Sequence, residues 1–253
     1  MDLDCAAPNR DTNSGYEEKM RTKLIFCVLL TFLAGSAFAA KPVLGVAEFK
    51  NEVNNVSWWS SDVARELSGM LTNELASTGK FKMVEREKLD KVLDEQDLAD
   101  SGRVDKKTGA KIGKLTGAQY LVVATVTAFE NQTRGTGGGV SFRGISVGGK
   151  KEDAYIAIDL RVIDTTTGEV EFTRSIEARA SSGGMAVGLY RGGFGGELSK
   201  YENTPTGKAL RAMTIEASEY LACAMVDQDD CMDDYNAKEK SRKEKTKRAI
   251  KLD

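Results

Sequence analysis

The sequence predicts one α/β domain, of the α+β kind, in which helices pack on a mixed sheet. Three observations predict it. Apolar or β-branched runs alternate with amphipathic helical patterns over residues 43–127. Two alternating strands around a tight turn, within residues 154–178, indicate an antiparallel hairpin. A further helical pattern covers residues 205–225. The expected order is β-α-β-α-α-β-β-β-α, and such an order favours a layered domain with strands of both directions.

The first strand and helix are predicted by an apolar run followed by a capping residue. Residues 43–49 (VLGVAEF) are almost entirely apolar, as expected of a buried strand. Ser60 or Ser61 can cap a helix, because a serine hydroxyl accepts hydrogen bonds from the free N–H groups of the first turn. Apolar residues then recur at helical spacing, and Gly79 is typical of the position just after a helix end.

Three shorter elements follow before the central strand. Residues 81–84 predict a second strand, and residues 89–96 predict a helix that is heavily charged on one side. Thr108 can cap a third, short helix, which would carry Ile112 and Leu115 and would close at a glycine.

The second half of the predicted core contains a central strand, a hairpin and a helix. Residues 120–129 (YLVVATVTAF) are nearly all apolar or β-branched, as in a strand covered on both faces. Residues 154–163 and 170–178 alternate between apolar and polar side chains around the turn at 164–168, so one side of this hairpin should face solvent. Thr204-Pro205 is typical of a cap followed by proline in the first helical turn.

The composition excludes several classes of enzyme. The chain has 253 residues, 41% hydrophobic and 29% charged, with a net charge of −2 and no histidine. A Ser-His-Asp triad, a Cys-His pair and an HExxH zinc site are therefore impossible. The near-neutral charge gives no basic field of the kind that marks nucleic-acid binding. We expect a protein that is not an enzyme and has no nucleic-acid partner.

An export signal is predicted near the start of the chain. Residues 20–39 (MRTKLIFCVLLTFLAGSAFA) combine a basic beginning, an apolar stretch and a small-x-small ending, as a secretory signal peptide does. The mature chain would then begin at Ala40, where the absence of a cysteine predicts no lipid attachment at this cleavage point. The polar residues 1–19 fit no signal peptide, and we expect them to be a non-native upstream extension. The mature chain would comprise a domain over residues 40–226 and a charged tail over residues 227–253, solvated and in part helical.

Cys223 and Cys231 are the two cysteines that remain in the mature chain, and they are predicted to form a disulfide in an oxidising compartment. A bridge across so short a loop would stabilise the fold by roughly 2–3 kcal/mol on the chain-entropy model. Two free thiols are the alternative.

Two glycine-rich insertions interrupt the predicted core, over residues 131–153 and 179–203. Each has about the length of two membrane-crossing strands of roughly 9–11 residues with a turn between them. Alternating apolar residues within them predict membrane hairpins; the positions are Val140, Phe142, Ile145, Val147, Met185, Val187, Leu189 and Phe194. The alternative is that both insertions are flexible, water-exposed loops.

The glycines do not predict a nucleotide site, nor do the acidic residues predict a metal site. Residues 144–151 (GISVGGKK) lack the Ser or Thr that a P-loop needs at its last position, and no apolar helix follows. The acidic stretch 227–234 lacks the glycine and the closing glutamate of an EF-hand loop. We therefore expect no cofactor and no metal ion.

Three motifs together resemble the CsgG/HfaB family, whose pore members serve curli secretion. Residues 69–96 (GMLTNELASTGKFKMVEREKLDKVLDEQ) resemble the helix–strand–helix core of that family. Residues 117–121 (GAQYL) resemble its entry to the central strand, and residues 160–169 (LRVIDTTTGE) resemble its hairpin. The resemblance covers about residues 43–225, nearly the whole mature chain. It implies a single periplasmic α/β domain whose two insertions are membrane β-hairpins, and which joins with its copies in a ring around an outer-membrane barrel.

The family resemblance also implies a loop that narrows the channel after the first strand. Its candidate residues here are Asn51, Asn54, Asn55, Trp58 and Trp59. The alternative is that at least one tryptophan packs against the first helix. The resemblance implies an exported assembly or secretion-channel component of the periplasm or outer membrane, with envelope or secreted protein partners. The alternative function is a soluble periplasmic protein-interaction module with the same fold and no pore.

Overall fold

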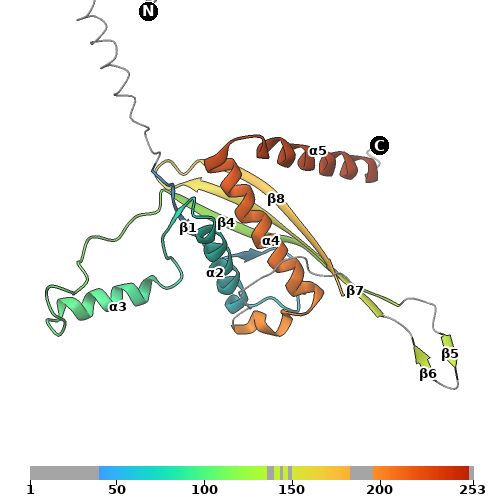
Figure 1. Cartoon of the computed structure of the whole chain (residues 1–253), viewed down its shortest axis with the longest axis horizontal. Helices are drawn as coiled ribbons and strands as arrows, with labels where there is room; N and C mark the ends of the chain where they lie inside the picture. Colours follow the sequence, from blue (N-terminus) through green and yellow to red (C-terminus); the bar gives the residue numbers. More distant parts are fainter. Residues whose placement is uncertain (1–39, 136–139, 143–144, 148–149, 183–195, 251–253) are drawn as a thin grey trace, which may run out of the picture. The chain divides into compact units, whose positions relative to one another are not determined.

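The computed structural model describes residues 40–135, 140–142, 145–147, 150–182 and 196–250. The described residues from Lys41 onward form one compact unit. Along the chain its elements are β1 (Val43–Val46), β2 (Lys50–Asn51), α2 (Ser61–Ser77), β3 (Lys82–Met83), α3 (Leu89–Asp100), β4 (Tyr120–Gly135), β5 (Val140–Phe142), β6 (Ile145–Val147), β7 (Lys150–Asp164), β8 (Val170–Ser181), the short 3-10 helix η1 (Gly196–Tyr201), α4 (Pro205–Ala222), the π-helical turn η2 (Cys223–Asp227) and α5 (Cys231–Ala249) (Figure 1).

The main sheet is mixed, as the sequence predicts. Its order is β3-β1-β4-β7-β8, and β2 pairs with β4 beside β1. β1 runs parallel to β3 and β4, whereas β4, β7 and β8 form an antiparallel meander. β8 is therefore an edge strand. The predicted α/β fold class is confirmed.

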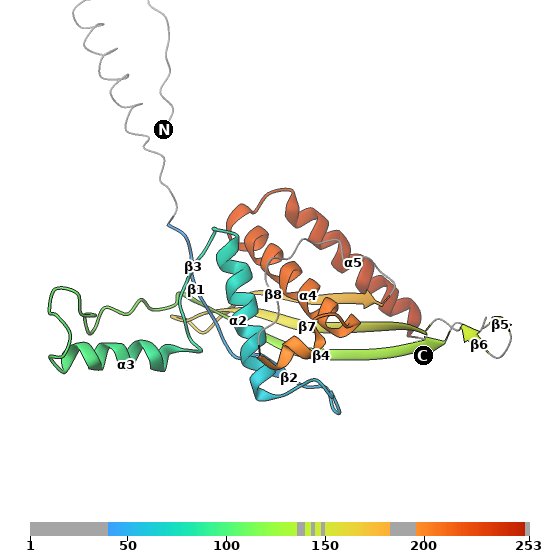
Figure 2. The same ribbon diagram turned by 60° about the horizontal axis from the view of Figure 1, so that its bottom comes forward.

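The helices α2 and α4 pack on the same face of this sheet (Figure 2). Leu67 and Leu71 of α2 and Leu210 and Met213 of α4 are fully buried, together with alternate residues of the strands such as Val122. Burial of such side chains contributes about 1.5–3 kcal/mol each, which is the main energy holding the two layers together.

The helices α2 and α4 begin where their capping residues predict. The Ser60 hydroxyl accepts a hydrogen bond from the N–H of Val63 at 3.2 Å. The Thr204 hydroxyl accepts a hydrogen bond from the N–H of Gly207 at 3.2 Å, and Pro205 occupies the first turn of α4. Each cap satisfies an N–H group that has no partner within the helix, which fixes the start of the element.

The central strand β4 is covered on one face rather than on two. Val122, Ala124 and Val126 are fully buried, whereas Leu121 and Val123 between them are only partly buried. The prediction of cover on both faces is therefore wrong for one face. The nearly continuous apolar run misled the prediction, because β-branched residues are favoured in strands whether or not both faces are buried.

The predicted third helix is absent, since residues 101–119 form turns and extended chain. Gly113 adopts a φ of +73°, a left-handed conformation that glycine reaches easily and that ends a helix. Ile112 is 58% exposed and Leu115 is 47% exposed. Without a surface on which to bury these two side chains, a short helix has little tertiary stabilisation.

The chain after η2 forms a regular helix, α5, over most of the stretch expected as a charged tail. Tyr235 near its start is only 8% exposed and belongs to the main core. In the described part of the chain, none of the helices has the length and apolar character required to cross a bilayer.

Candidate functional site

The predicted constriction loop joins β2 to α2 and has a fixed base and an exposed tip. The side chain of Asn51 accepts a hydrogen bond from the N–H of Val53 and donates one to its carbonyl, both at 2.9 Å. Asn54 and Asn55 at the tip are exposed, and Asn55 has a φ of +58°. Asparagine tolerates this left-handed conformation better than other side chains do. The tip is thus accessible and held in a defined turn.

The two tryptophans of the loop differ in exposure. Trp58 is 3% exposed, and its ring lies 5.4 Å from the ring of Phe129 on β4 and 5.7 Å from that of Trp59, both edge-to-face. Its indole N–H has no hydrogen-bond partner among the described residues. Trp58 therefore packs in the core, as one of the two interpretations of the sequence expects. Trp59 is only partly buried.

The first insertion begins as a continuation of the sheet. β4 and β7 stay paired from Glu130 opposite Tyr155 as far as Gly135 opposite Lys150. Beyond them, β5 and β6 form a separate hairpin in which Val140 pairs with Val147, Phe142 with Ile145, and a serine with a serine between them. The strands thus run well into residues 131–153, and the four apolar positions predicted there are two cross-strand pairs.

The second insertion is described only at its two ends. Of its predicted membrane residues, Met185, Val187, Leu189 and Phe194 lie outside the described residues. Its return to the core is fixed by Glu66 of α2, whose carboxylate accepts the N–H groups of Glu197 and Leu198, each at 2.8 Å. The Leu198 side chain is fully buried. Nothing in the local sequence pattern marks Glu66 for this role, because its partners are more than 130 residues away.

A disulfide joins Cys223 of η2 to Cys231 of α5, with their Cα atoms 6.0 Å apart. The bridge spans the bend where the chain leaves α4 and begins α5, and Gln228 turns the chain there with a φ of +49°. The carboxylate of Asp229 lies close to both sulfur atoms. Because the two cysteines are bonded to each other, they offer no thiolate pair to a metal ion.

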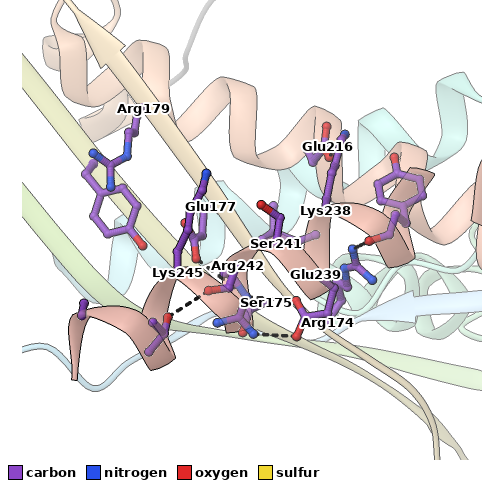
Figure 3. Close-up of a pocket in the computed structure, with 15 residues that line it drawn as sticks. Arg174, Ser175, Glu177, Arg179, Glu216, Lys238, Glu239, Ser241, Arg242 and Lys245 are labelled. Carbon is purple, nitrogen blue, oxygen red and sulfur yellow. Dashed lines mark hydrogen bonds and ion pairs between the residues drawn. The ribbon is translucent and has the colours of Figure 1, made fainter. Parts of the chain in front are cut away.

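A groove lies between the edge strand β8 and α5, and the sequence did not predict it (Figure 3). Its volume is about 850 Å³. Arg174, Glu177 and Arg179 reach it from β8, and Lys238 and Arg242 reach it from α5. The one signal in the sequence was Tyr235, because an aromatic residue at the start of an otherwise charged helix indicates where that helix docks.

Arg174 fastens α5 to the sheet at one end of the groove. Its guanidinium lies 5.3 Å from the ring centroid of Tyr220 on α4 and 5.5 Å from that of Tyr235 on α5. It also donates a hydrogen bond to the Tyr235 carbonyl. Burial raises the pKa of both tyrosines. The phenols therefore stay neutral, and the rings present their faces to the cation.

Several charged side chains of α5 that line the groove form ion pairs. Arg242 binds Glu239 through two nitrogens, at 2.7 and 2.9 Å, and lies 3.9 Å from Glu177. Lys238 binds Glu216 at 3.0 Å. Glu239 accepts hydrogen bonds from Arg242 and from Lys243. These bonds, that of Arg242 first, lower the pKa of Glu239 to about 2.

Three cations of the groove, Arg174, Arg179 and Lys245, have no carboxylate partner among the described residues, and Arg174 is held by the two tyrosines. Lys245 makes no ion pair there, and the Arg179 guanidinium lies over the Tyr155 ring, 4.5 Å from its centroid. In all, five basic and three acidic side chains line the groove. Sites for small molecules are predominantly apolar, so a lining of this kind suits a charged protein segment better than a small ligand.

Comparison with known protein families gives one match over most of the chain. The model described as "Curli production assembly/transport component CsgG" matches residues 31–250. Curated proteins of that description from Salmonella typhimurium and Escherichia coli K12 are each 24% identical over 137 residues, which is 53% of this chain and 50% of theirs. The chain thus spans about half the length of the curated relatives it matches.

Comparison with solved structures finds distant similarities. A hypothetical protein of Chlamydia trachomatis is 14% identical with a TM-score of 0.42, covering 73% of this chain and 97% of that one. Lipoprotein GNA1162 of Neisseria meningitidis is 16% identical with a TM-score of 0.34, covering 58% and 89%. The PelC dodecamer of Paraburkholderia phytofirmans is 14% identical with a TM-score of 0.31, covering 69% and 89%.

Proposed function

The chain belongs to the CsgG family, and from this premise we propose that it is a non-catalytic component of the bacterial envelope that binds other proteins, its own copies included, without crossing the membrane. The family model describes an assembly and transport component, which supports an assembly role. The signal peptide predicted at residues 20–39 supports export. The partners would be envelope or secreted proteins.

The observation that carries this proposal is the polar character of the strands that lead into the first insertion. β4 and β7 remain paired between Asn131 opposite Ala154 and Gly135 opposite Lys150. Apart from Gly135 and Ala154, the residues along this stretch are polar or charged: Asn131, Gln132, Thr133, Arg134, Lys150, Lys151, Glu152 and Asp153. A strand that faces lipid needs an apolar residue at every second position, and this stretch lacks that pattern. This part of the hairpin is suited to water.

The chain that remains beyond these paired strands is short. Residues 136–149 have to supply both arms of the hairpin and its turn, and β5 and β6 have three residues each. Two crossing strands would need about 9–11 residues each. The length therefore favours a hairpin that projects from the domain over one that crosses a membrane.

Membrane fractionation tests the proposal. The full chain is expressed with its own leader in a Gram-negative host, and membranes are washed with alkaline carbonate to strip peripheral proteins. Val140→Asp and Phe142→Asp are compared with the wild type, and Ser141→Asp is the matched control. We expect the carbonate wash to release the wild type and all three variants alike, because none of these positions meets lipid.

The contrary result would be wild-type protein in the carbonate-washed outer-membrane pellet, from which Val140→Asp and Phe142→Asp are lost while Ser141→Asp stays. That pattern would favour the second candidate, a secretion channel. One observation favours this candidate: Val140 and Phe142 pair with Val147 and Ile145, so apolar pairs alternate with a serine pair in the short hairpin. Such alternation is typical of strands with one apolar face.

A further inference from the structure

The segment of residues 89–117, which we call the arm, exposes most of the large hydrophobic side chains on the described surface. Of the eight such residues in the described part of the chain, five lie in the arm: Val92, Leu93, Leu98, Ile112 and Leu115. Their exposed fractions range from 38% to 58%. A contiguous exposed apolar segment in a folded protein marks an interaction surface.

The arm is folded on itself but is not part of the main core. Its helix α3 contributes no residue to the core cluster, and Gln96 is its only buried side chain. The loop after it turns back, with the N–H of Gly109 bonded to the Asp105 carbonyl at 2.8 Å, and Gly109 packs close to Ala99. A helix of this length has little stability in water unless its apolar face is covered. The arm therefore lacks a partner surface.

The charges of the arm show what that surface should be. α3 carries five acidic residues and one lysine. Lys91 lies 3.3 Å from both Asp90 and Asp94, so it neutralises part of this charge. Glu95 and Asp97 have no cationic partner among the described residues and are exposed. The arm thus presents apolar side chains beside free carboxylates.

The groove between β8 and α5 has the complementary chemistry. Arg179 and Lys245 are exposed cations without a carboxylate partner in the described structure, and the partly buried ring of Tyr155 lies beside Arg179. α3, with twelve residues, is about 18 Å long at 1.5 Å per residue, and the stretch of α5 from Tyr235 to its end is only slightly longer, at about 22 Å. In both views the arm projects from one side of the sheet, and the C-terminal end of α5 lies on the other (Figures 1 and 2).

We infer that the arm of one copy docks along the β8–α5 groove of a second copy. The acidic residues Glu95 and Asp97 meet Arg179 and Lys245, and the apolar side chains of the arm pack against the Tyr155 ring. The contact is heterologous, because it joins two different surfaces of identical chains, and repeated contacts of this type produce a ring if the rotation closes. This inference rests on the part of the proposed function in which copies of the chain bind one another.

Charge reversal on each side separately, and then on both, tests the inference. The arm variant is Glu95→Lys with Asp97→Lys, and the groove variant is Arg179→Glu with Lys245→Glu. Glu169→Lys with Glu171→Lys is the matched control, which changes two exposed acids beside the hairpin turn that belong neither to the arm nor to the groove lining. The mature protein is studied by analytical ultracentrifugation at 0.15 M salt, and circular dichroism verifies the fold of each variant.

We expect the wild type and the control to self-associate, and the arm and groove variants each to do so at least about tenfold more weakly, since like charges now face each other. A 1:1 mixture of the two variants should associate again, because the intact arm of one variant meets the intact groove of the other and the reversed arm meets the reversed groove. The variant with all four substitutions should associate again, with its charges exchanged.

Three outcomes would overturn the inference: a wild type that stays monomeric at about 100 μM, at which an interface of even micromolar affinity would be occupied; arm and groove variants that associate as the wild type does; or a 1:1 mixture that does not associate although both variants are folded. These outcomes are distinct from a failure of the proposed function, which is tested by membrane retention and not by association.

Discussion

The guanidinium of Arg174 on β8 lies 5.5 Å from the ring centroid of Tyr235 on α5 and donates a hydrogen bond to the carbonyl of the same residue. One side chain thus holds both the ring and the backbone of the helix at the edge of the sheet. The groove exists because α5 is kept beside β8. The first two predictions concern the stability of this attachment.

Arg174→Ala should loosen α5 and lower the free energy of unfolding by about 1.5–3 kcal/mol, because it removes a charged hydrogen bond and a cation–π contact. Urea unfolding measures the loss, and hydrogen exchange should show faster exchange along α5. Arg161→Ala on the exposed side of β7 is the control and should change little. Equal stability of the two variants would contradict the role assigned to Arg174.

Removing the disulfide by Cys223→Ser with Cys231→Ser should lower stability by roughly 2–3 kcal/mol, because the unfolded chain regains the freedom of the short loop. The melting temperature of the oxidised wild type should fall on addition of a reductant, whereas that of the double variant should stay constant. A wild type that melts at the same temperature with and without reductant would argue against a stabilising bridge.

The return of the second insertion should depend on Gly196. A Cβ atom there would lie 1.9 Å from a carboxylate oxygen of Glu66, and its φ of +52° disfavours other residues. Gly196→Ala should therefore cost about 1–3 kcal/mol in urea unfolding. Gly69→Ala, at a helical position of α2 with open space around it, is the control and should stabilise the protein by about 0.5–1 kcal/mol. Equal effects of the two changes would be inconsistent with the contact.

The loop before α2 offers a test of backbone conformation. Asn55 has a φ of +58°, so Asn55→Val should cost about 1–2 kcal/mol, while Asn55→Gly should be nearly neutral. Asn54→Val, at an exposed neighbour without positive φ, is the matched control. Thermal melting distinguishes the variants, and a neutral Asn55→Val would show that the turn relaxes.

Glu239 should make part of the stability depend on acid pH. Its hydrogen bonds from Arg242 and Lys243 lower its pKa to about 2, below its value in the unfolded chain. A lowered pKa means that the stabilisation is present above about pH 4.5 and is lost as the pH falls toward 2. Urea unfolding at pH 6, 4 and 3 should show a smaller loss for Glu239→Gln than for the wild type. If the wild type and Glu239→Gln lost the same amount of stability on acidification, the ionised Glu239 would not be stabilised by its neighbours.

The sequence by itself determined the elements whose signals are local. The caps at Ser60 and Thr204 and the alternation along β7 and β8 act within a few residues, so α2, α4 and the hairpin could be predicted. The failure at residues 108–117 has the same origin. A cap and two apolar residues predict a helix, but a short helix needs a surface to pack against, and that surface is a tertiary property.

Tertiary structure alone decided which distant residues meet. Glu66 binds the backbone at Leu198, and Arg174 holds Tyr235, across 132 and 61 positions of the chain. The polarity of each side chain can be read from the sequence, but its partner depends on how the sheet brings α2, α4 and α5 together. The lining of the β8–α5 groove could not be predicted for this reason: its cations come from a strand and a helix that only the folded chain places side by side.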